Sequence, residues 1–222
     1  MKLIEDALKR GAKSLSEYES KLLLAEYGIP ITREGIVTTA EDAVKKAAEI
    51  GFPVVLKGSG EAISHKTEMN LISLNLKDKE DVRQAFKELT TNPKAKVKEI
   101  LVQQMVKGDR ELMVGLTRDS QFGPCVMYGL GGIFTEILED VAFRVAPLTH
   151  WDALDMMNDI KGKKILEAFR GKPAVDREML ADILLALGQI GLDHEKVHEI
   201  DINPLKLIDG KPVAVDALVV FE

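Results

Sequence analysis

The chain has 222 residues, of which 45% are hydrophobic and 30% charged, and its formal net charge is −6 at neutral pH. This composition is typical of a globular protein of one large or two smaller domains, and the acidic balance argues against a general nucleic-acid binder. No apolar run approaches the roughly 20 residues that span a bilayer, and the single cysteine, Cys125, excludes an internal disulfide. We therefore expect a cytoplasmic protein that does not enter the membrane.

Two helices are predicted in the N-terminal part of the chain. Ser16 and Glu19 have the spacing of a capping box, in which each side chain pairs with a backbone amide of the first helical turn, and Gly28 ends this helix. Thr39 is the expected N-cap of the second helix, which ends at Gly51.

Two strands and a third helix follow. The run 54–57 (VVLK) is short, β-branched and apolar up to its last residue, which is typical of a buried strand that presents Lys57 at its exposed end. Alternating apolar residues over 72–76 predict the second strand, and Asp78 is the expected N-cap of the helix.

The polar segment 90–98 (TTNPKAKVK) marks the expected boundary between two subdomains, residues 1–98 and 99–222. It contains a proline and several lysines and has no sustained apolar period, as solvated connectors do. Beyond it we expect helices from Thr149 and over 180–190, and strands at 100–106, 111–117, 124–128, 141–146, 199–208 and 212–221. This mixture of helices and hairpins predicts an α+β fold, or an α/β fold with largely antiparallel pieces.

The last two predicted strands could form a metal site. A two-residue turn at Asp209 and Gly210 would place Asn203 opposite Asp216, with Asp201 two residues back on the same face. Opposed β-carbons lie about 5 Å apart, so an amide oxygen and a carboxylate at these positions could bind a hard cation such as Mg²⁺.

A second interpretation of this hairpin stays open, because polar residues on the solvent face of a hairpin need no function. A bulge near Pro204 or Pro212 would also change the register and separate the two side chains.

Glycines at 129, 131 and 132 directly follow a predicted apolar strand. Glycine lets successive backbone amides approach an anion, so Gly131 and Gly132 could bind a phosphate, but they could equally form a tight turn. The sequence is not a Walker loop, and Phe134 stands where a dinucleotide fingerprint requires its third glycine. Arg144 lies in an otherwise apolar predicted strand, so its guanidinium either faces solvent or has an anionic partner.

His65 lies in the polar segment SHKTE, with no second histidine nearby in sequence. Such a residue is either structural or simply exposed, or it acts as a general base, a metal ligand or a carrier of a phosphoryl group, since a neutral imidazole is nucleophilic near neutral pH.

Four segments in one order bring these features together: YGIPITREGIVTT, GFPVVLKGSGEAISHKTE, GLGGIFTEILEDVAFRVAPLT and EIDINPL. They resemble the ATP-grasp domain of ADP-forming acyl-CoA synthetases, in particular the separate β subunit of acetyl-CoA synthetases, and the resemblance covers nearly the whole chain. It implies an ATP-grasp fold whose two α+β subdomains hold ATP or ADP between them, with a hinge near the predicted boundary.

The resemblance also implies roles for the nucleotide-binding residues. Lys57 would reach the nucleotide phosphates, and the hinge strand would contact the adenine through Gln103, Gln104 and Val106. Glu111 matches a family glutamate near the nucleotide, to which we assign no definite contact.

The terminal hairpin resembles the Mg²⁺ site of the family, with Asn203 and Asp216 as ligands. Succinyl-CoA synthetases have Glu-Ile-Asn-Pro where this chain has Asp-Ile-Asn-Pro, so the shorter Asp201 leaves its own role open.

His65 matches a histidine that is transiently phosphorylated in this family. The implied reaction converts acyl-CoA and phosphate into an acyl phosphate and CoA, after which a histidine of an α subunit takes the phosphoryl group and passes it through His65 to ADP. Gly131, Gly132 and Arg144 would bind the travelling group.

The CoA-binding and ligase domains that such a synthetase needs would belong to a separate α subunit, in an expected α₂β₂ assembly. Two other functions stay open. One is an ATP-grasp ligase that forms an acyl phosphate at its own site and does not need His65. The other is a catalytically silent nucleotide-binding module.

Overall fold

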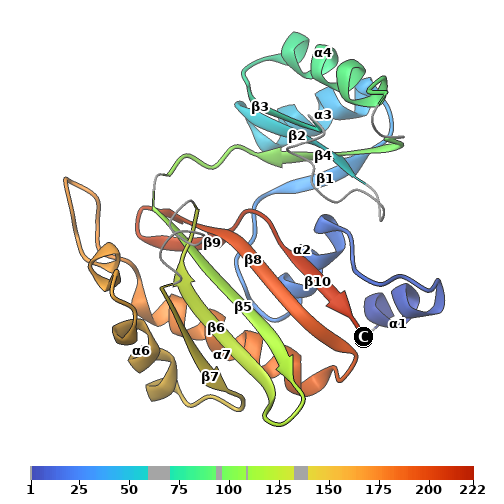
Figure 1. Ribbon diagram of the computed structural model, residues 1–222. Coiled ribbons are helices and arrows are strands. Elements are labelled where there is room, and N and C mark those ends of the chain that lie inside the picture. The colour runs from blue at the N-terminus through green and yellow to red at the C-terminus, as the bar shows by residue number, and fades with distance from the viewer. Residues whose placement is uncertain (1, 60–70, 94–96, 109, 133–139) are drawn as a thin grey trace. The chain divides into compact units, whose positions relative to one another are not determined.

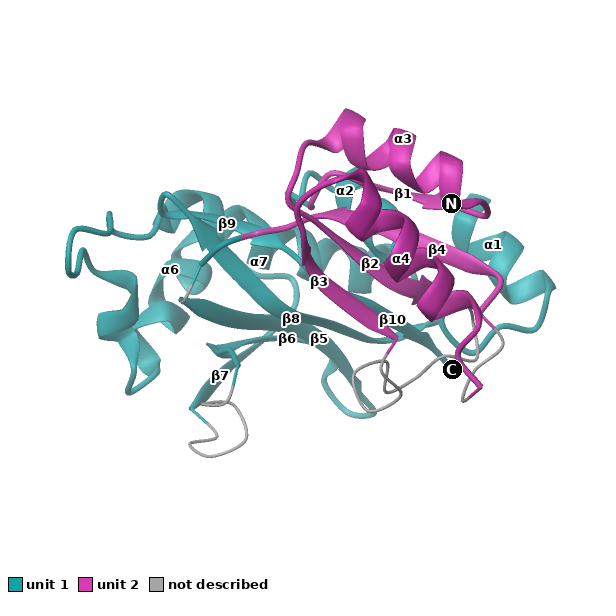
Figure 2. Cartoon of the chain, turned by 90° about the horizontal axis from the view of Figure 1, so that it is seen from above, with its two compact units in different colours: residues 1–31, 107–222 teal, residues 32–106 magenta. Residues whose placement is uncertain are grey.

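The computed structural model describes residues 2–59, 71–93, 97–108, 110–132 and 140–222 (Figure 1). The chain forms two compact units: unit 1 contains residues 1–31 and 107–222, and unit 2 contains residues 32–106 (Figure 2). His65 lies outside the described residues.

The boundaries of the units differ from the expected division between residues 98 and 99. Strand β4 (Glu99–Gln104) pairs with β1 (Glu34–Val37) and β2 (Val54–Ser59), so the hinge strand belongs to unit 2. The N-terminal residues belong to unit 1, where the backbone amide of Leu15 donates to the carbonyl of Val219 at 2.9 Å. Pairing between segments far apart in sequence therefore assigns β4 to unit 2 and the N-terminal residues to unit 1.

Unit 2 is a four-stranded antiparallel sheet in the order β1-β4-β2-β3, with β3 at Ile72–Leu76. Helices α3 (Ala40–Ile50) and α4 (Lys79–Thr90) supply apolar side chains to a core shared with one face of the sheet. The predicted N-caps are confirmed: the side chains of Thr39 and Asp78 accept hydrogen bonds from backbone amides of the first turns.

Unit 1 contains a six-stranded antiparallel sheet. Its strands lie in the order β10-β8-β5-β6-β7, and β9 pairs with the other end of β8. Helix α7 (Arg177–Asp193) lies behind β5 and β6 in Figure 1, with α6 beside it. The remaining elements are α1 (Lys2–Lys9), α2 (Glu17–Glu26), β5 (Glu111–Asp119), β6 (Gly123–Leu130), β7 (Val141–Val145), α6 (His150–Asp159), the 3₁₀ helix η1 (Lys163–Leu166), β8 (Val197–Ile208), β9 (Lys211–Ala214) and β10 (Leu218–Phe221).

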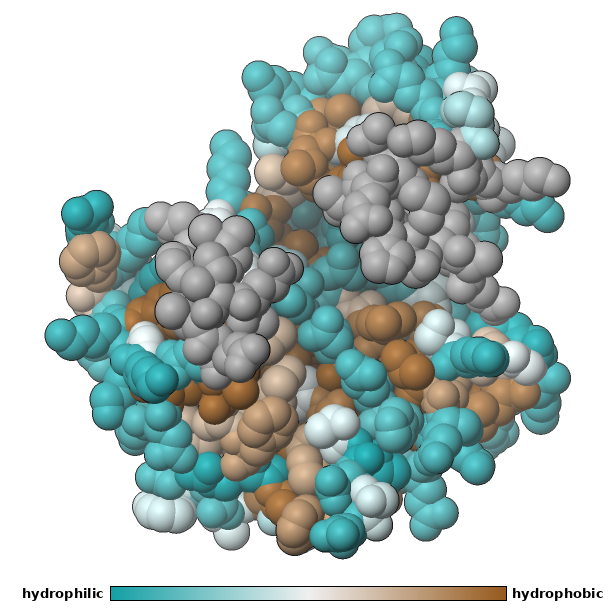
Figure 3. Space-filling view, in the orientation of Figure 1, coloured by the Kyte–Doolittle hydropathy of each residue, from teal (hydrophilic) through white to brown (hydrophobic). Residues whose placement is uncertain are grey.

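Alternation along the strands separates two faces of the unit 1 sheet. Leu112, Val114 and Leu116 of β5 belong to the buried core with α6 and α7, so Met113 and Gly115 belong to the opposite face. The register places Asp201 of β8 beside Gly115, and therefore on this opposite face as well. Figure 3 shows apolar patches on the side of unit 1 that faces the viewer.

The predicted strand over 212–221 is wrong as a single element, because it is divided into β9 and β10. The division has a physical cause at Val215. Its carbonyl accepts a hydrogen bond from the buried ammonium of Lys21 at 3.1 Å, while its amide donates to the carbonyl of Pro204. No helix in the described part of the chain has the length and apolar character needed to span a bilayer.

Candidate active site

The C-terminal hairpin has the register that the sequence predicts. Ile208 pairs with Lys211 next to the turn, Leu205 pairs with Ala214 at the end of β9, and Asp201 pairs with Leu218 beyond it. These pairs keep one register although the strand between them is interrupted. Asn203 and Asp216 therefore occupy opposed positions in the hairpin. The register does shift beside Pro204 between β8 and β5, where Leu205 pairs with Leu112 but Ile202 pairs with Val114, and this shift leaves the pairing within the hairpin unchanged.

The carboxylate of Asp201 lies in an unfavourable environment for a negative charge. Its Oδ1 atom is buried and has no hydrogen-bond partner among the described residues. Burial raises its pKa to about 6, and the nearby charges of Glu199 and Asp216 act in the same direction. A buried carboxylate oxygen that is repelled by two nearby acids favours a bound cation, so the residues present fit Mg²⁺.

The glycine opposite Asp201 is required by the sheet. A Cβ atom at Gly115 would lie 2.5 Å from the carbonyl oxygen of Ile200, so no larger residue fits there without moving β8. In the described part of the chain no three His, Cys, Asp or Glu side chains converge as metal ligands. A cation site with oxygen ligands on this hairpin would combine the side-chain amide oxygen of Asn203 with the carboxylates of Asp201 and Asp216.

The glycine turn after β6 packs against the start of β5. The amide of Gly131 donates to the carbonyl of Glu111 at 2.9 Å, and a Cβ atom at Gly131 would lie 2.7 Å from the carbonyl oxygen of Leu112. The close approach of two backbones accounts for this glycine, and its amide is already used within the sheet. Gly132 has a φ of 66° and lies beside the carboxylate of Glu111.

Glu111 connects the glycine turn to β8. Its Oε1 atom lies 3.0 Å from the ammonium of Lys206, which also donates to the carbonyl of Gly108 at 3.3 Å. Sequence reasoning missed Lys206, although its position directly opposite Glu111 follows from the pairing of β5 with β8.

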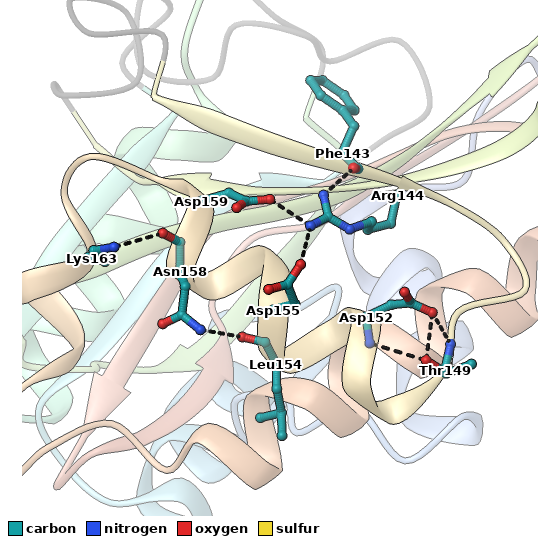
Figure 4. Close-up of polar contacts among 9 residues, drawn as sticks. All are labelled: Phe143, Arg144, Thr149, Asp152, Leu154, Asp155, Asn158, Asp159 and Lys163. Atoms are coloured by element: carbon teal, nitrogen blue, oxygen red, sulfur yellow. Dashed lines mark hydrogen bonds and ion pairs between the residues drawn. The ribbon is translucent and has the colours of Figure 1, made fainter.

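Arg144 is bound by two acids of helix α6. Its guanidinium lies 2.8 Å from a carboxylate oxygen of Asp155 and 2.6 Å from one of Asp159, and it donates to the carbonyl of Phe143 (Figure 4). The hydrogen bond to Asp159 is the largest cause of the raised pKa of this guanidinium. The sequence left two alternatives for Arg144, exposure to solvent or an anionic partner, and the second is observed. The anionic partners are side chains of this chain and not a bound phosphate.

The structure does not bring Arg144 to the glycine turn. Arg144 pairs with Val126, five residues before Gly131 on the neighbouring strand. Five residues of strand span about 16 Å. The signal that sequence analysis missed is the pair Asp155 and Asp159, which are four residues apart and so lie on one face of the helix.

In unit 2, Lys57 and Gln103 share the face of the sheet opposite the helices. Lys57 is only 5% exposed, and Val55, two residues before it, pairs with Gln103. The amide of Gln103 donates to the hydroxyl of Thr32 at 2.8 Å, and this hydroxyl donates to Glu34. Thr32 and Glu34 give no motif in the sequence; only the pairing of β1 with β4 connects them to Gln103.

The other two hinge residues differ in their surroundings. The side-chain oxygen of Gln104 accepts a hydrogen bond from the guanidinium of Arg33 at 3.2 Å, whereas Val106 is buried just beyond the end of β4. The predicted strand over 100–106 is therefore two residues too long.

Comparison with known proteins places this arrangement in a family. A family model described as an ATP-grasp domain matches residues 6–221. The β subunit of ADP-forming acetate–CoA ligase I from Pyrococcus furiosus is 42% identical, and the match covers 99% of this chain and 96% of the relative. The chain belongs to the ATP-grasp family of ADP-forming acetate–CoA ligase β subunits. The resemblance and the ATP-grasp fold expected from the sequence are thereby confirmed.

A second relative has a different length. ADP-forming acetate–CoA ligase I from Archaeoglobus fulgidus is 38% identical, and the match covers 96% of this chain but 32% of the relative. The chain thus spans about a third of that longer protein, whose remaining two thirds have no counterpart here.

Solved structures agree with this assignment. Acetyl-coenzyme A synthetase 1 from Ca. Korarchaeum cryptofilum, in complex with coenzyme A, Ca-AMPCP and HgCl⁺, matches with a TM-score of 0.95 and 41% identity, over 100% of this chain and 99% of the other. A second structure of that protein, with a TM-score of 0.89 and 42% identity over the same shares of the two chains, contains coenzyme A and Mg-AMPPCP, and its phosphohistidine segment points towards the nucleotide binding site.

Proposed function

We propose that this chain is the β subunit of an ADP-forming acyl-CoA synthetase and transfers a phosphoryl group between a histidine relay and ADP. The observation that carries the proposal is the 42% identity to a β subunit over 96% of its length. The buried, unpartnered oxygen of Asp201 beside Asn203 and Asp216 supports a cation-assisted phosphate site independently of that identity.

The proposed contacts of unit 2 with the nucleotide involve four residues. Lys57 would bind the nucleotide phosphates, and Gln103, Gln104 and Val106 would contact the adenine, as the family resemblance implies. The burial of Lys57 supports its role, because a buried ammonium interacts strongly with an anionic ligand.

The proposed Mg²⁺ site consists of Asn203 and Asp216, with Asp201 as an added oxygen donor. Bound there, Mg²⁺ would neutralise charge on the nucleotide phosphates. Glu111 is held by its ion pair with Lys206, lies beside Gly132 and would be near the nucleotide.

We assign the relay to His65. An imidazole nitrogen of His65 would attack the phosphorus held by the histidine of the α subunit, and that N–P bond would break. A terminal oxygen of ADP would then attack the phosphorus on His65, forming ATP and returning the electron pair to the imidazole. Two short transfers remove the need for one site that holds both acyl-CoA and ADP.

The partner is proposed to be an α subunit with the CoA-binding and ligase domains, in an α₂β₂ assembly. The relatives that are named as β subunits, and the longer Archaeoglobus relative, support such a partner. Acyl recognition would then belong to the α subunit.

The test is a reconstitution. The chain mixed with its α subunit should form ATP from acetyl-CoA, ADP and phosphate in the presence of Mg²⁺, and neither subunit alone should do so. ATP formation by the isolated chain would contradict the proposal, and so would an inactive mixture of two folded subunits.

A further inference from the structure

The segment 161–172 (KGKKILEAFRGK) connects α6 to α7 and has a charge opposite to that of the whole chain. It contains five basic residues and a single acid, Glu167, although the chain carries a net charge of −6. Glu167 is paired outside the segment, with the guanidinium of Arg177 at 2.7 Å. In Figure 1 this segment extends away from the sheet of unit 1. We call it the basic hairpin.

Three acids near the basic hairpin in the fold have other partners or bind its backbone. Asp155 and Asp159 bind Arg144, and Asp140 accepts the backbone amides of Lys161 and Gly162 at 2.7 and 2.6 Å. None of these carboxylates is paired with the side chain of Lys164 or Arg170.

The basic hairpin is held in one conformation. The guanidinium of Arg110 donates to the carbonyl oxygens of Ile165 and Glu167 at 3.2 Å and to that of Pro173 at 2.7 Å. The amide of Val175 donates to the carbonyl of Leu166 at 2.8 Å. A fixed base reduces the entropy lost when the tip of the hairpin binds a partner.

The tip presents an aromatic ring and a cation. Phe169 is 61% exposed, and the guanidinium carbon of Arg170 lies 5.0 Å from the centre of its ring. Phe169 and Lys172 exchange two backbone hydrogen bonds, of 3.1 and 3.0 Å, around the two-residue turn Arg170-Gly171. Exposed aromatic and arginine side chains are the residues most enriched at the centres of protein interfaces.

Arg170 occupies a position that its backbone does not favour. Arg170 and Gly171 have φ values of 48° and 78°, as in a type I′ turn, where asparagine is the preferred first residue. An arginine side chain in the left-handed region costs free energy that asparagine would largely avoid. The contact of the guanidinium with the Phe169 ring offsets part of this cost, and it keeps the cation beside the exposed ring at the tip.

We propose that the basic hairpin is a docking element for the α subunit, and that Arg170 and Lys164 contact an acidic surface of that subunit while Phe169 enters an apolar pocket beside it. The inference rests on the proposed function, because it needs an α subunit. Charge complementarity selects an acidic protein surface, and the exposed ring selects a surface with an adjoining apolar pocket.

The experiment measures the affinity of the purified full chain for its α subunit at low and moderate salt. The substitution pair K164E/R170E should weaken binding by about tenfold or more at low salt and less at moderate salt, and F169A should weaken it about fivefold. The pair K13E/K196E is the matched control: it reverses two exposed lysines of the same unit and should change the affinity by less than about twofold.

The variant R170N separates docking from folding. It should weaken binding to the α subunit about fivefold while the midpoint of thermal unfolding stays the same or rises, because asparagine suits the turn better than arginine does. Wild-type affinity in both K164E/R170E and R170N would overturn the inference. So would an equal loss in K13E/K196E, or a loss seen only in self-association of the chain or in its binding of coenzyme A. Failure of the wild-type chain to bind the α subunit would instead contradict the proposed function.

Discussion

At the scale of single residues, Arg144 shows how a local pattern can be interpreted correctly and still lead to a different role. An arginine within an apolar strand predicts an anionic partner, and the structure supplies two, Asp155 and Asp159. Because these acids lie on α6, the guanidinium joins β7 to that helix. A role in phosphoryl binding stays a prediction, and it would require Arg144 to exchange these partners.

The substitution R144M separates the two roles. We expect it to lower the free energy of unfolding by about 1 kcal/mol, because the pair is partly exposed and partly screened, and to lower the melting temperature by about 2–4 °C. The affinity of the chain for Mg-ATP, measured by calorimetry, should not change.

The opposite pattern would favour the role assigned from the sequence. If R144M unfolds at the wild-type temperature but the reconstituted complex transfers phosphoryl groups at a greatly reduced rate, Arg144 binds the travelling group.

Other residues of the site could be predicted to different degrees. The opposed positions of Asn203 and Asp216 followed from one turn dipeptide, because a two-residue hairpin fixes its own register. Lys206 and Thr32 could not be predicted, since their contacts with Glu111 and Gln103 depend on strands far apart in sequence.

At the scale of elements, helix α7 contacts the sheet through two glycines with different surroundings. A Cβ atom at Gly191 would lie 2.5 Å from Cδ1 of Leu116 and 2.7 Å from Cβ of Pro124. At Gly188 the nearest atom would be 3.4 Å away, in Leu148, which is an ordinary contact. Only Gly191 is therefore required for the approach of the helix to the sheet.

The two glycines predict opposite effects of alanine in one helix. G191A should lower the free energy of unfolding by about 1–3 kcal/mol, since the methyl group overpacks the core. G188A should raise it by about 0.5–1 kcal/mol, since alanine has the higher helix propensity and fits the space.

Urea unfolding followed by circular dichroism measures both changes. Equal effects of the two substitutions would show that packing against β5 and β6 does not decide the role of these glycines.

The terminal strand shows where prediction of elements fails. All residues from 212 to 221 except Asp216 are apolar, so the sequence favours one strand. The break at 215–217 arises because Lys21, almost two hundred residues away, donates to the carbonyl of Val215. A tertiary contact of this kind leaves no local signal. The capping box predicted at Ser16 and the helix start predicted at Thr149 were confirmed because they depend on local sequence.

At the scale of the whole molecule, the chain is divided into units by strand pairing more than by linkers. The polar segment 90–98 has the composition of a boundary, yet it lies within unit 2. The chain leaves unit 1 after residue 31 and returns at residue 107, so the N-terminal residues share a core with the C-terminal strands. Composition alone does not contain this information.

The proposed function depends on one covalent event, the transfer of a phosphoryl group to His65. The matched control is His150, which is half-exposed on α6 and contacts only Glu178 among the interactions described for it. H65N and H150N each remove one imidazole, so they differ only in which histidine is lost.

The most direct measurement is incubation of the purified chain with γ-labelled ATP and Mg²⁺, followed by mapping of acid-labile, base-stable label. We expect label on His65 in the wild-type chain and in H150N, and none in H65N or after removal of Mg²⁺ by a chelator. Two results would contradict the proposed function. One is a wild-type chain that stays unlabelled both alone and together with its α subunit, and the other is label on the H65N variant.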